Sequence, residues 1–269
     1  MKRIAALVGK ELSELRRSPS IFVPAVLTGA AAILYPFIIA IVVPSIAGER
    51  LSDSSDVELA SQVYRSQPET RTLTPEGAIQ AFIFEYALVL MVGLTTVTGS
   101  MAVAAHSVVG EKQARSLEPL LATPVTTFEL LAAKVIGAAL PGIALMAACF
   151  VVYVGGVATF AAPKVWVFML TGRLLALVFV MGPLAALLGL QLAVCASSRV
   201  NDPRSAHQLG ALVIVIPVAA LQMAQFLGGI VLTAPTIAAI AAALSVANAV
   251  LMVIAIRLFD RESILTRWK

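Results

Sequence analysis

The chain has 269 residues, of which 59% are hydrophobic and 13% charged, with a formal net charge of +4. A soluble domain carries about 25% charged residues, so the composition excludes an ordinary soluble protein. The apolar residues form continuous blocks long enough to cross a bilayer, which predicts an all-α membrane protein with one transmembrane domain over residues 1–269. Because the basic residues lie at the ends of these blocks and not on one soluble face, a nucleic-acid-binding function is excluded.

The N-terminal segment, residues 1–18, predicts an amphipathic helix. Its apolar residues recur at helical spacing: Ile4, Leu7, Val8, Leu12 and Leu15. Lysine and arginine cover much of the other side, and Ser18-Pro19 ends the pattern. Such a helix either lies in the inner membrane interface, leading into the first span, or packs on a partner protein.

Six transmembrane helices are predicted, at residues 21–47, 79–106, 130–160, 166–196, 208–230 and 236–258. The first apolar block is too long, and starts too far into the chain, for a cleaved signal peptide. The uncharged run 205–256 is too long for one span, and the glycines and prolines between Gly228 and Pro235 place its division there.

Two charged residues fall inside predicted spans. Glu85 and Arg173 each lie about eight residues from the outer end of their span, at a similar depth of roughly 10–12 Å. An unpaired charge there costs about 2.5–3.5 kcal/mol. Three interpretations follow: a structural ion pair, a substrate or cation site, or two charges that reach separately to the outer surface. Gln222 and Gln225 are further candidates for a substrate pathway.

Two loops differ in character. Residues 48–77 carry six acidic residues and three arginines without metal-ligand spacing, which predicts a solvated extracytoplasmic loop. The loop of residues 110–129 contains a predicted short helix, with Ser116 as its N-cap and Thr123-Pro124 at its end. Leu117, Leu120 and Leu121 form one apolar face of that helix, and Thr126 and Glu129 form a capping box for the third span. The short helix is either a docking surface or an interfacial connector.

The second inner loop, residues 197–207, has its own capping signals. Asp202 caps the fifth span and Pro203 takes its first helical position. Arg199 and Arg204 pair either with that acid or with lipid phosphates. Residues 259–269 form a terminal tail.

The distribution of basic residues sets the orientation. Fourteen of the 19 lie in the N-terminal segment, residues 107–134, residues 197–207 and the C-terminal end of the chain. By the positive-inside rule, both termini are predicted in the cytoplasm and the chain in the cell (inner) membrane.

These segments resemble a known family. The stretch Gly110-Glu-Lys-Gln-Ala-Arg-Ser-Leu-Glu-Pro-Leu-Leu-Ala-Thr-Pro-Val125 is similar to the first cytoplasmic loop of type-2 ABC exporter permeases. Lys10-Glu-Leu with Arg16-Arg-Ser-Pro19 resembles the elbow helix of that family, and the segment from Ser197 to Ala206 its second cytoplasmic loop. The tail from Phe259 to Trp268 resembles the branch that includes sodium and drug exporters.

The resemblance implies a permease of two copies, as a homodimer or heterodimer, bound to two cytoplasmic P-loop ATPase subunits within membrane lipid. The helix of residues 116–122 would be the coupling helix. Glu111, Arg115 and Glu118 would be polar contacts at its rim, and the three leucines its apolar seat. ATP and magnesium would be bound by the partner, with no cofactor, metal or catalytic residue in this chain.

The sequence lacks the motifs of several other functions. The chain contains no G-x-x-x-x-G-K-[ST] phosphate-binding loop, no H-E-x-x-H and no G-x-S-x-G motif, which argues against an ATPase or an intramembrane enzyme. The sequence therefore predicts an ABC exporter permease that moves a drug or a sodium-like cation outward by alternating access. The alternatives are an exporter of lipid or glycan, and a secondary transporter or channel that works without an ATPase.

Overall fold

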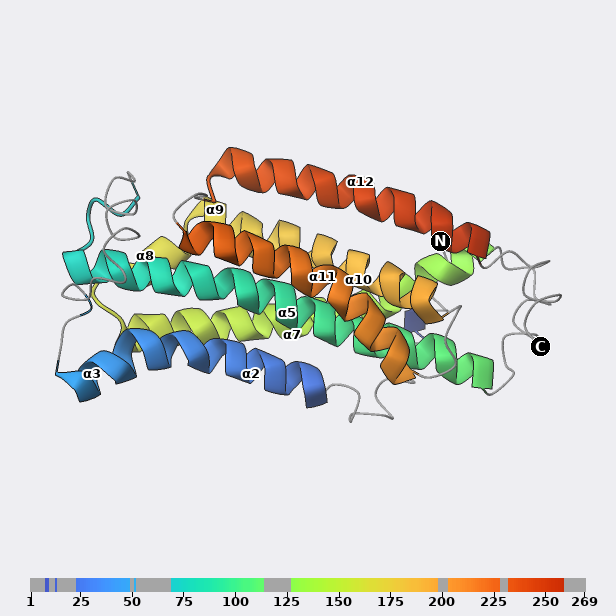
Figure 1. The fold of residues 1–269 in the computed structure, drawn as a ribbon, viewed down its shortest axis with the longest axis horizontal. Coiled ribbons are helices and arrows are strands. Elements are labelled where there is room, and N and C mark those ends of the chain that lie inside the picture. Colours follow the sequence, from blue (N-terminus) through green and yellow to red (C-terminus); the bar gives the residue numbers. More distant parts are fainter. Residues whose placement is uncertain are drawn as a thin grey trace.

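The computed structural model describes residues 8–9, 13, 23–48, 51, 69–113, 127–197, 203–227 and 232–258. Every long element in this part of the chain is helical, as predicted, and the long helices run side by side as a bundle (Figure 1). The elements are α2 (Val23–Phe37), η2 (Ile38–Val42), α3 (Val43–Ala47), α5 (Pro75–Gln113), α7 (Thr127–Phe160), α8 (Val165–Met169), α9 (Gly172–Ala176), η5 (Leu177–Met181), α10 (Gly182–Ser197), α11 (Pro203–Phe226) and α12 (Ala234–Leu258).

Five stretches of the described helices are long and apolar enough to cross a membrane: Val23–Ala47, Pro75–Thr96, Val135–Phe160, Gly172–Ala193 and Ala234–Arg257. A shorter apolar helix, Val215–Phe226, forms the second half of α11. The described α11 extends to Phe226 and α12 begins at Ala234, so the interval between them overlaps the segment from Gly228 to Pro235 where the division is predicted. A sixth span along α11 stays a prediction.

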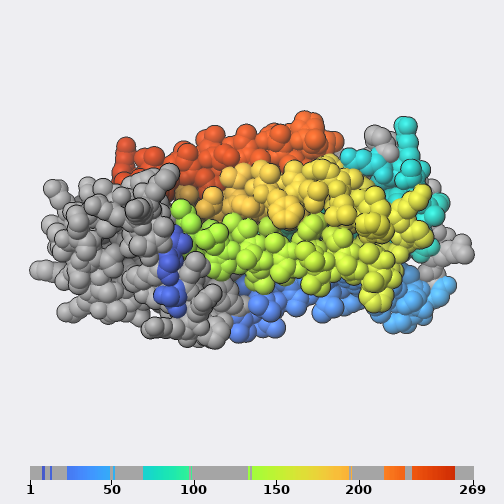
Figure 2. Space-filling view, turned by 180° about the vertical axis from the view of Figure 1, so that it is seen from behind, coloured from blue at the N-terminus to red at the C-terminus, as the bar shows by residue number. Residues whose placement is uncertain are grey.

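Helix α5 forms the centre of the bundle. It contacts α2, α7, α10 and α11, and 78% of the residues in its most apolar stretch are buried. The same share is 17% for the first span and 11% for α12. Figure 2 shows α12, α10, α7 and α2 following one another across one face, with α5 largely covered behind them.

The start of α5 follows from local capping rules. The Thr74 hydroxyl accepts a hydrogen bond from the Gly77 N–H at 3.1 Å, Pro75 occupies the first helical position and Glu76 lies in the first turn. The described helix extends to Gln113, beyond residue 106, where the predicted span stops. Glu111, Lys112 and Gln113 are good helix formers, so the helix continues beyond the apolar stretch.

The fourth predicted span, expected to be continuous over residues 166–196, is broken. Short α8 ends at Met169, Thr171 is extended with ψ of 145°, and the long helical run begins at Gly172. Thr171 is the N-cap residue of α9 but makes no side-chain cap hydrogen bond. The break coincides with threonine and glycine, two weak helix formers. Arg173 therefore lies in the first turn of a helix and not in the middle of one.

Two π-helical turns precede prolines at the same spacing. In η2 the Val43 N–H bonds to the Ile38 carbonyl, and in η5 the Gly182 N–H bonds to the Leu177 carbonyl. The next residue in each case is a proline, Pro44 or Pro183, which has no N–H and whose ring crowds the carbonyl four residues before it. One extra residue in the turn relieves that crowding.

Candidate functional site

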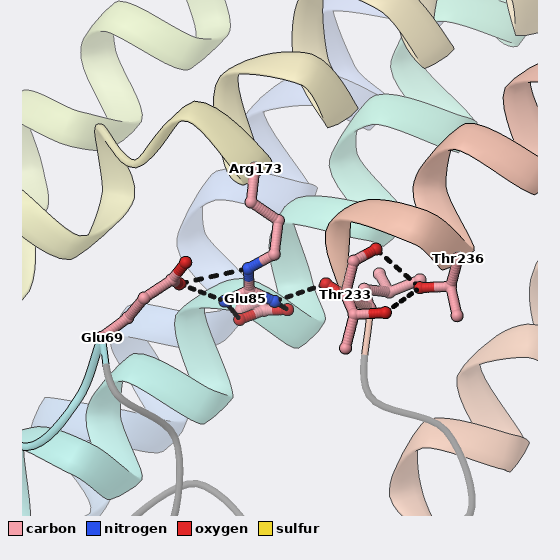
Figure 3. A network of polar contacts seen from close by, with 6 residues as sticks. Glu69, Glu85, Arg173, Thr233 and Thr236 are labelled. Atoms are coloured by element: carbon pink, nitrogen blue, oxygen red, sulfur yellow. Dashed lines mark hydrogen bonds and ion pairs between the residues drawn. The ribbon is translucent and has the colours of Figure 1, made fainter.

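The described part of the bundle buries one network of charged groups, centred on Arg173. Both Glu85 oxygens accept hydrogen bonds from this guanidinium, at 2.6 Å from Nη1 and 2.9 Å from Nη2. The Arg173 Nε bonds to a Glu69 oxygen at 3.2 Å, and Nη1 also donates to the Leu232 carbonyl at 2.7 Å. Figure 3 shows Arg173 reaching between Glu69 and Glu85, with the start of α12 beside it.

Burial separates the two carboxylates. The side chains of Glu85 and Arg173 are 0% and 6% exposed, whereas that of Glu69 is 38% exposed. The Glu85–Arg173 contact is thus a desolvated two-pronged ion pair, and Glu69 closes the network on its open side. Removing one member of such a pair costs about 3–5 kcal/mol, because the other charge stays buried without its partner.

The network joins segments that are distant in sequence. Glu85 lies on α5, Arg173 opens α9, Glu69 precedes α5 and Leu232 lies in the connection between α11 and α12. Because Arg173 is in the first turn of its helix, its charge faces the positive end of the helix dipole. The two carboxylates offset that unfavourable arrangement. The structure therefore brings Glu85 and Arg173 together, as the ion-pair interpretation requires.

Further polar contacts tie α5 to its neighbours near this network. The Tyr153 hydroxyl donates to the Phe84 carbonyl at 2.8 Å, and Gln222 Nε2 donates to the Tyr86 carbonyl at 3.0 Å. Gln80 Oε1 accepts from the Ala162 N–H at 2.7 Å. With the ion pair, these bonds attach α5 to four other segments over two helical turns. The Glu85 level of the bundle is therefore its most strongly cross-linked layer among the described residues.

A cavity of about 330 Å³ lies one helical turn from the ion pair. Val89 follows Glu85 by one turn on α5, Leu177 follows Arg173 by one turn on η5, and the side chain of Leu232 also lines the space. The remaining walls come from α10, α11 and α12, and all lining residues are apolar or glycine. Gly93 is part of the wall, and a Cβ there would meet Val218 of α11 at 3.2 Å.

The predicted pathway residues Gln222 and Gln225 lie on α11 near this cavity. They are 4% and 6% exposed. Val218 and Leu221 line the cavity, and Gln222 and Gln225 each follow one of them by four residues on the same helix face. The Oε1 atoms of both glutamines have no hydrogen-bond partner among the described residues.

Most residues of the predicted coupling site and second cytoplasmic loop lie outside the part of the chain that the structure describes. Arg115, Leu117, Glu118, Leu120, Leu121, Arg199 and Asp202 lie outside the described residues. The backbone positions of Glu111 and Arg204 fall in α5 and α11, and their side chains are not described. Of the predicted N-terminal helix, Val8, Gly9 and Ser13 are described and helical. The roles assigned to these segments stay predictions.

Three features of the site were not predicted from the sequence: Glu69, the Leu232 carbonyl and the cavity. Glu69 is one of several acids in a polar loop, and nothing in its sequence surroundings marks it as the partner of Arg173. Leu232 contributes a backbone carbonyl, which carries no sequence signal. The cavity depends on the gap between four helices. Within the described residues no group of three or more His, Cys, Asp or Glu side chains is placed to hold a metal ion.

Comparison with known families supplies the identity. Residues 5–238 match the sequence model of the family described as ABC-2 family transporter protein. No curated protein and no solved structure matches the chain. The match covers most of the chain, includes the ion pair, and agrees with the resemblance of the 110–129 loop. The chain belongs to the ABC-2 transporter family, as a multi-pass membrane subunit of the permease kind whose family implies an ABC ATPase partner.

Proposed function

We propose that the chain is the permease subunit of an exporter, and that a partner ATPase drives it through the loop of residues 110–129. The family match carries the first part of this proposal. The preference for export rests on the resemblance of that loop, of the elbow segment and of the tail to exporter permeases. The basic residues at the ends of the spans support a cytoplasmic position for the loop.

The length of α5 supports a route for the driving force. This helix has 39 residues without an interruption, about 58 Å, whereas the hydrocarbon core is about 30 Å thick. The helix is therefore too long to lie wholly within the bilayer. We propose that its C-terminal end leads toward the predicted coupling helix, while Glu85 lies in its N-terminal third. A displacement of the loop by the ATPase would move α5 and, with it, the layer that holds the ion pair.

The cargo we propose is a small molecule and not a sodium-like cation. Both oxygens of the Glu85 carboxylate accept hydrogen bonds from Arg173, and the pair is buried. A cation at Glu85 would have to displace the guanidinium, which opposes binding by charge repulsion. The nearby apolar cavity favours an apolar or amphipathic cargo. In alternating access, the cross-linked layer at Glu85 would form part of the outer closure.

Capture of the partner ATPase tests this proposal. The full chain with an affinity tag is purified from its native membrane, and a stoichiometric P-loop ATPase is expected with it. Leu120→Glu, in the predicted apolar seat, should reduce the amount of captured ATPase at least tenfold, because a buried leucine at an interface centre is replaced by a charge. Glu58→Ala, in the loop predicted on the opposite side, is the matched control and should leave capture unchanged.

The contrary outcome is equally clear. If the native chain captures no P-loop ATPase, or if Leu120→Glu captures as much as the native chain while Glu58→Ala does not, energy does not enter through this loop. A normal yield and normal unfolding temperature of Leu120→Glu would show that the variant is folded.

A further inference from the structure

The short helix α8 (Val165–Met169) lies at one boundary of the membrane. It stands between two stretches that are long and apolar enough to cross a bilayer, Val135–Phe160 and Gly172–Ala193. A helix of 5 residues is about 7.5 Å long and cannot cross a hydrocarbon core of about 30 Å, so the chain leaves and re-enters the membrane on one side. Figure 1 shows α8 at the end of the bundle where α3 and α9 also lie. The distribution of basic residues predicts that this is the outer side.

One face of α8 covers the ion pair. Val165, Phe168 and Met169 follow the helical spacing of a single face, and their side chains are buried. The Phe168 ring lies under the Arg173 guanidinium, with 5.6 Å between the ring centroid and Cζ. Because a cation over an aromatic face is attracted to the ring, this contact attaches α8 to the charged network. The orientation of α8 is therefore fixed, and with it the direction of its other side chains.

The opposite side of this segment is apolar and exposed. Trp166, Val167 and Leu170 are 43%, 50% and 42% exposed. Phe160, the last residue of α7, is also exposed, as is Val152 earlier on the same helix. In water these side chains would leave a large apolar area hydrated, which is unfavourable. Contact with lipid removes that cost along α7 and at α8 alike.

A lysine precedes this exposed side in a strained backbone conformation. Lys164 has a φ of 72°, in the left-handed region that favours glycine, and its side chain is exposed. The turn holds this conformation, because the Lys164 carbonyl accepts hydrogen bonds from the Val167 and Phe168 N–H groups at 3.1 and 3.3 Å. A glycine would form the same turn without strain, so the turn does not explain the lysine. Among the described residues, the Lys164 ammonium forms no ion pair.

Tryptophan and lysine together match the chemistry of a phospholipid headgroup region. The indole ring is apolar with one N–H donor, and tryptophan is enriched where hydrocarbon meets water. A lysine stem can lie along apolar surface while its ammonium reaches a phosphate. Because α8 must lie where the hydrocarbon core gives way to headgroups, a phospholipid is the occupant that both its position and its side chains favour.

We propose that α8 binds a phospholipid at this boundary, with the Lys164 ammonium on the phosphate and the Trp166 ring among the glycerol ester groups. The charge of Lys164 gives the site a preference for an anionic headgroup over a zwitterionic one. The contact uses side chains and not the N–H groups of the helix. It needs neither the ATPase nor a cargo, so this inference goes beyond the proposed transport function and fails or stands independently of it.

The depth of Trp166 tests the position of α8. The chain has two tryptophans, so Trp268→Phe leaves Trp166 as the single indole, and Trp166→Phe/Trp268→Phe supplies the background fluorescence. The full chain is reconstituted, without ATPase or nucleotide, in phosphatidylcholine vesicles that carry bromine either near the headgroup or near the chain ends. Bromine near the headgroup should quench Trp166 more strongly than bromine near the chain ends. Iodide in the water should quench Trp166 much more weakly than it quenches free tryptophan.

Two other patterns of quenching would overturn the proposal. Strong quenching by iodide with weak quenching by both lipids would show that α8 lies in water. Protection from all three quenchers would show that a protein surface covers α8, from a second copy or from another partner.

Lipid preference tests the role of Lys164. At equal mole fraction, we expect a roughly threefold preference of the Trp166 site for brominated phosphatidylglycerol over brominated phosphatidylcholine. Lys164→Gly removes the ammonium and also relieves the backbone strain, so this variant should fold and lose the preference, whereas Lys164→Arg should keep it. Arg257→Gln, at an exposed base in the last turn of α12, is the matched control and should change nothing. Equal quenching by the two lipids in the Trp268→Phe chain, or an unchanged preference in Lys164→Gly, would overturn the phosphate contact.

Discussion

Helices α5 and α12 are both apolar enough to span a membrane, but α5 lies at the centre of the bundle and α12 at its periphery. The mean hydropathy of their most apolar stretches is 1.8 for α5 and 2.4 for α12, yet 78% of that stretch is buried in α5 and 11% in α12. The less hydrophobic helix thus occupies the centre. In water the order would be reversed, because burial there follows hydrophobicity.

The difference comes from the polar groups on each helix. Buried polar residues of α5 include Gln80, Glu85, Thr95 and Thr96, while in α12 the buried polar residue is Asn248. Apolar side chains are as stable in lipid as in a protein interior. Burial of a helix within the bundle therefore gains free energy only from polar contacts and close packing. The position of a membrane helix in the bundle is therefore set by its polar residues and not by its mean hydropathy.

Breaking the ion pair should have the largest effect on this contrast. We expect Arg173→Leu to lower the free energy of unfolding by about 3–5 kcal/mol, because it leaves the Glu85 carboxylate buried without its partner. Chemical unfolding of the full chain in mild detergent measures it. Glu85→Leu/Arg173→Leu should recover most of the loss, since both desolvated charges are removed. A double variant no more stable than Arg173→Leu would contradict the pair as the organising contact of α5.

Two neighbouring glycines of α7 allow a packed face and an exposed face of one helix to be compared. A Cβ at Gly156 would meet the Phe37 ring at 2.7 Å, whereas one at Gly155 meets nothing within 4 Å. The Phe37 ring is held against Phe84 and Tyr153, so it cannot easily move aside. We expect Gly156→Ala to destabilise the chain by about 1–3 kcal/mol.

Gly155→Ala is the matched control and should stabilise the helix by roughly 0.5–1 kcal/mol. The same unfolding measurement in detergent compares the two. Equal effects of the two substitutions would mean that α2 and α7 do not approach each other at Gly156.

Removing the polar anchor of α12 should have the smallest effect. The Asn248 amide donates to the carbonyls of Leu184 and Leu244, and its oxygen accepts from Gln191. Interhelical hydrogen bonds in membranes contribute about 0.6 kcal/mol on average and up to about 1.7. Asn248→Leu should therefore cost about 1 kcal/mol and loosen α12 from α10. Because α12 has no cysteine, one cysteine is introduced into each helix of a chain without Cys149 and Cys195, and a changed rate of disulfide cross-linking between them reports the loosening.

Ser245→Ala provides the comparison, because that hydroxyl is exposed and bonds within its own helix to the Ala241 carbonyl. It should leave the free energy of unfolding within about 0.5 kcal/mol of that of the native chain. The rate of cross-linking should stay unchanged. A loss as large as that of Asn248→Leu would remove the distinction between anchoring and local hydrogen bonds.

Five of the six predicted spans are confirmed, because the length of an apolar run is itself the signal for a membrane-spanning helix. The meeting of Glu85 and Arg173 was one of three interpretations of two opposite charges at one depth in lipid. The break at Thr171 was missed, because a continuous apolar run hides a cap that depends on one extended residue. The order of helices in the bundle, the Leu232 carbonyl and the cavity depend on tertiary contacts that no local pattern encodes.

The most direct test of the proposed transport is the uptake of a fluorescent amphiphile into inside-out proteoliposomes that hold the chain with and without its ATPase. Uptake should require both the ATPase and hydrolysable ATP, and Leu120→Glu should abolish it while the chain stays folded. Uptake at an undiminished rate without ATPase and ATP would contradict an ATP-driven exporter and favour a secondary transporter or channel.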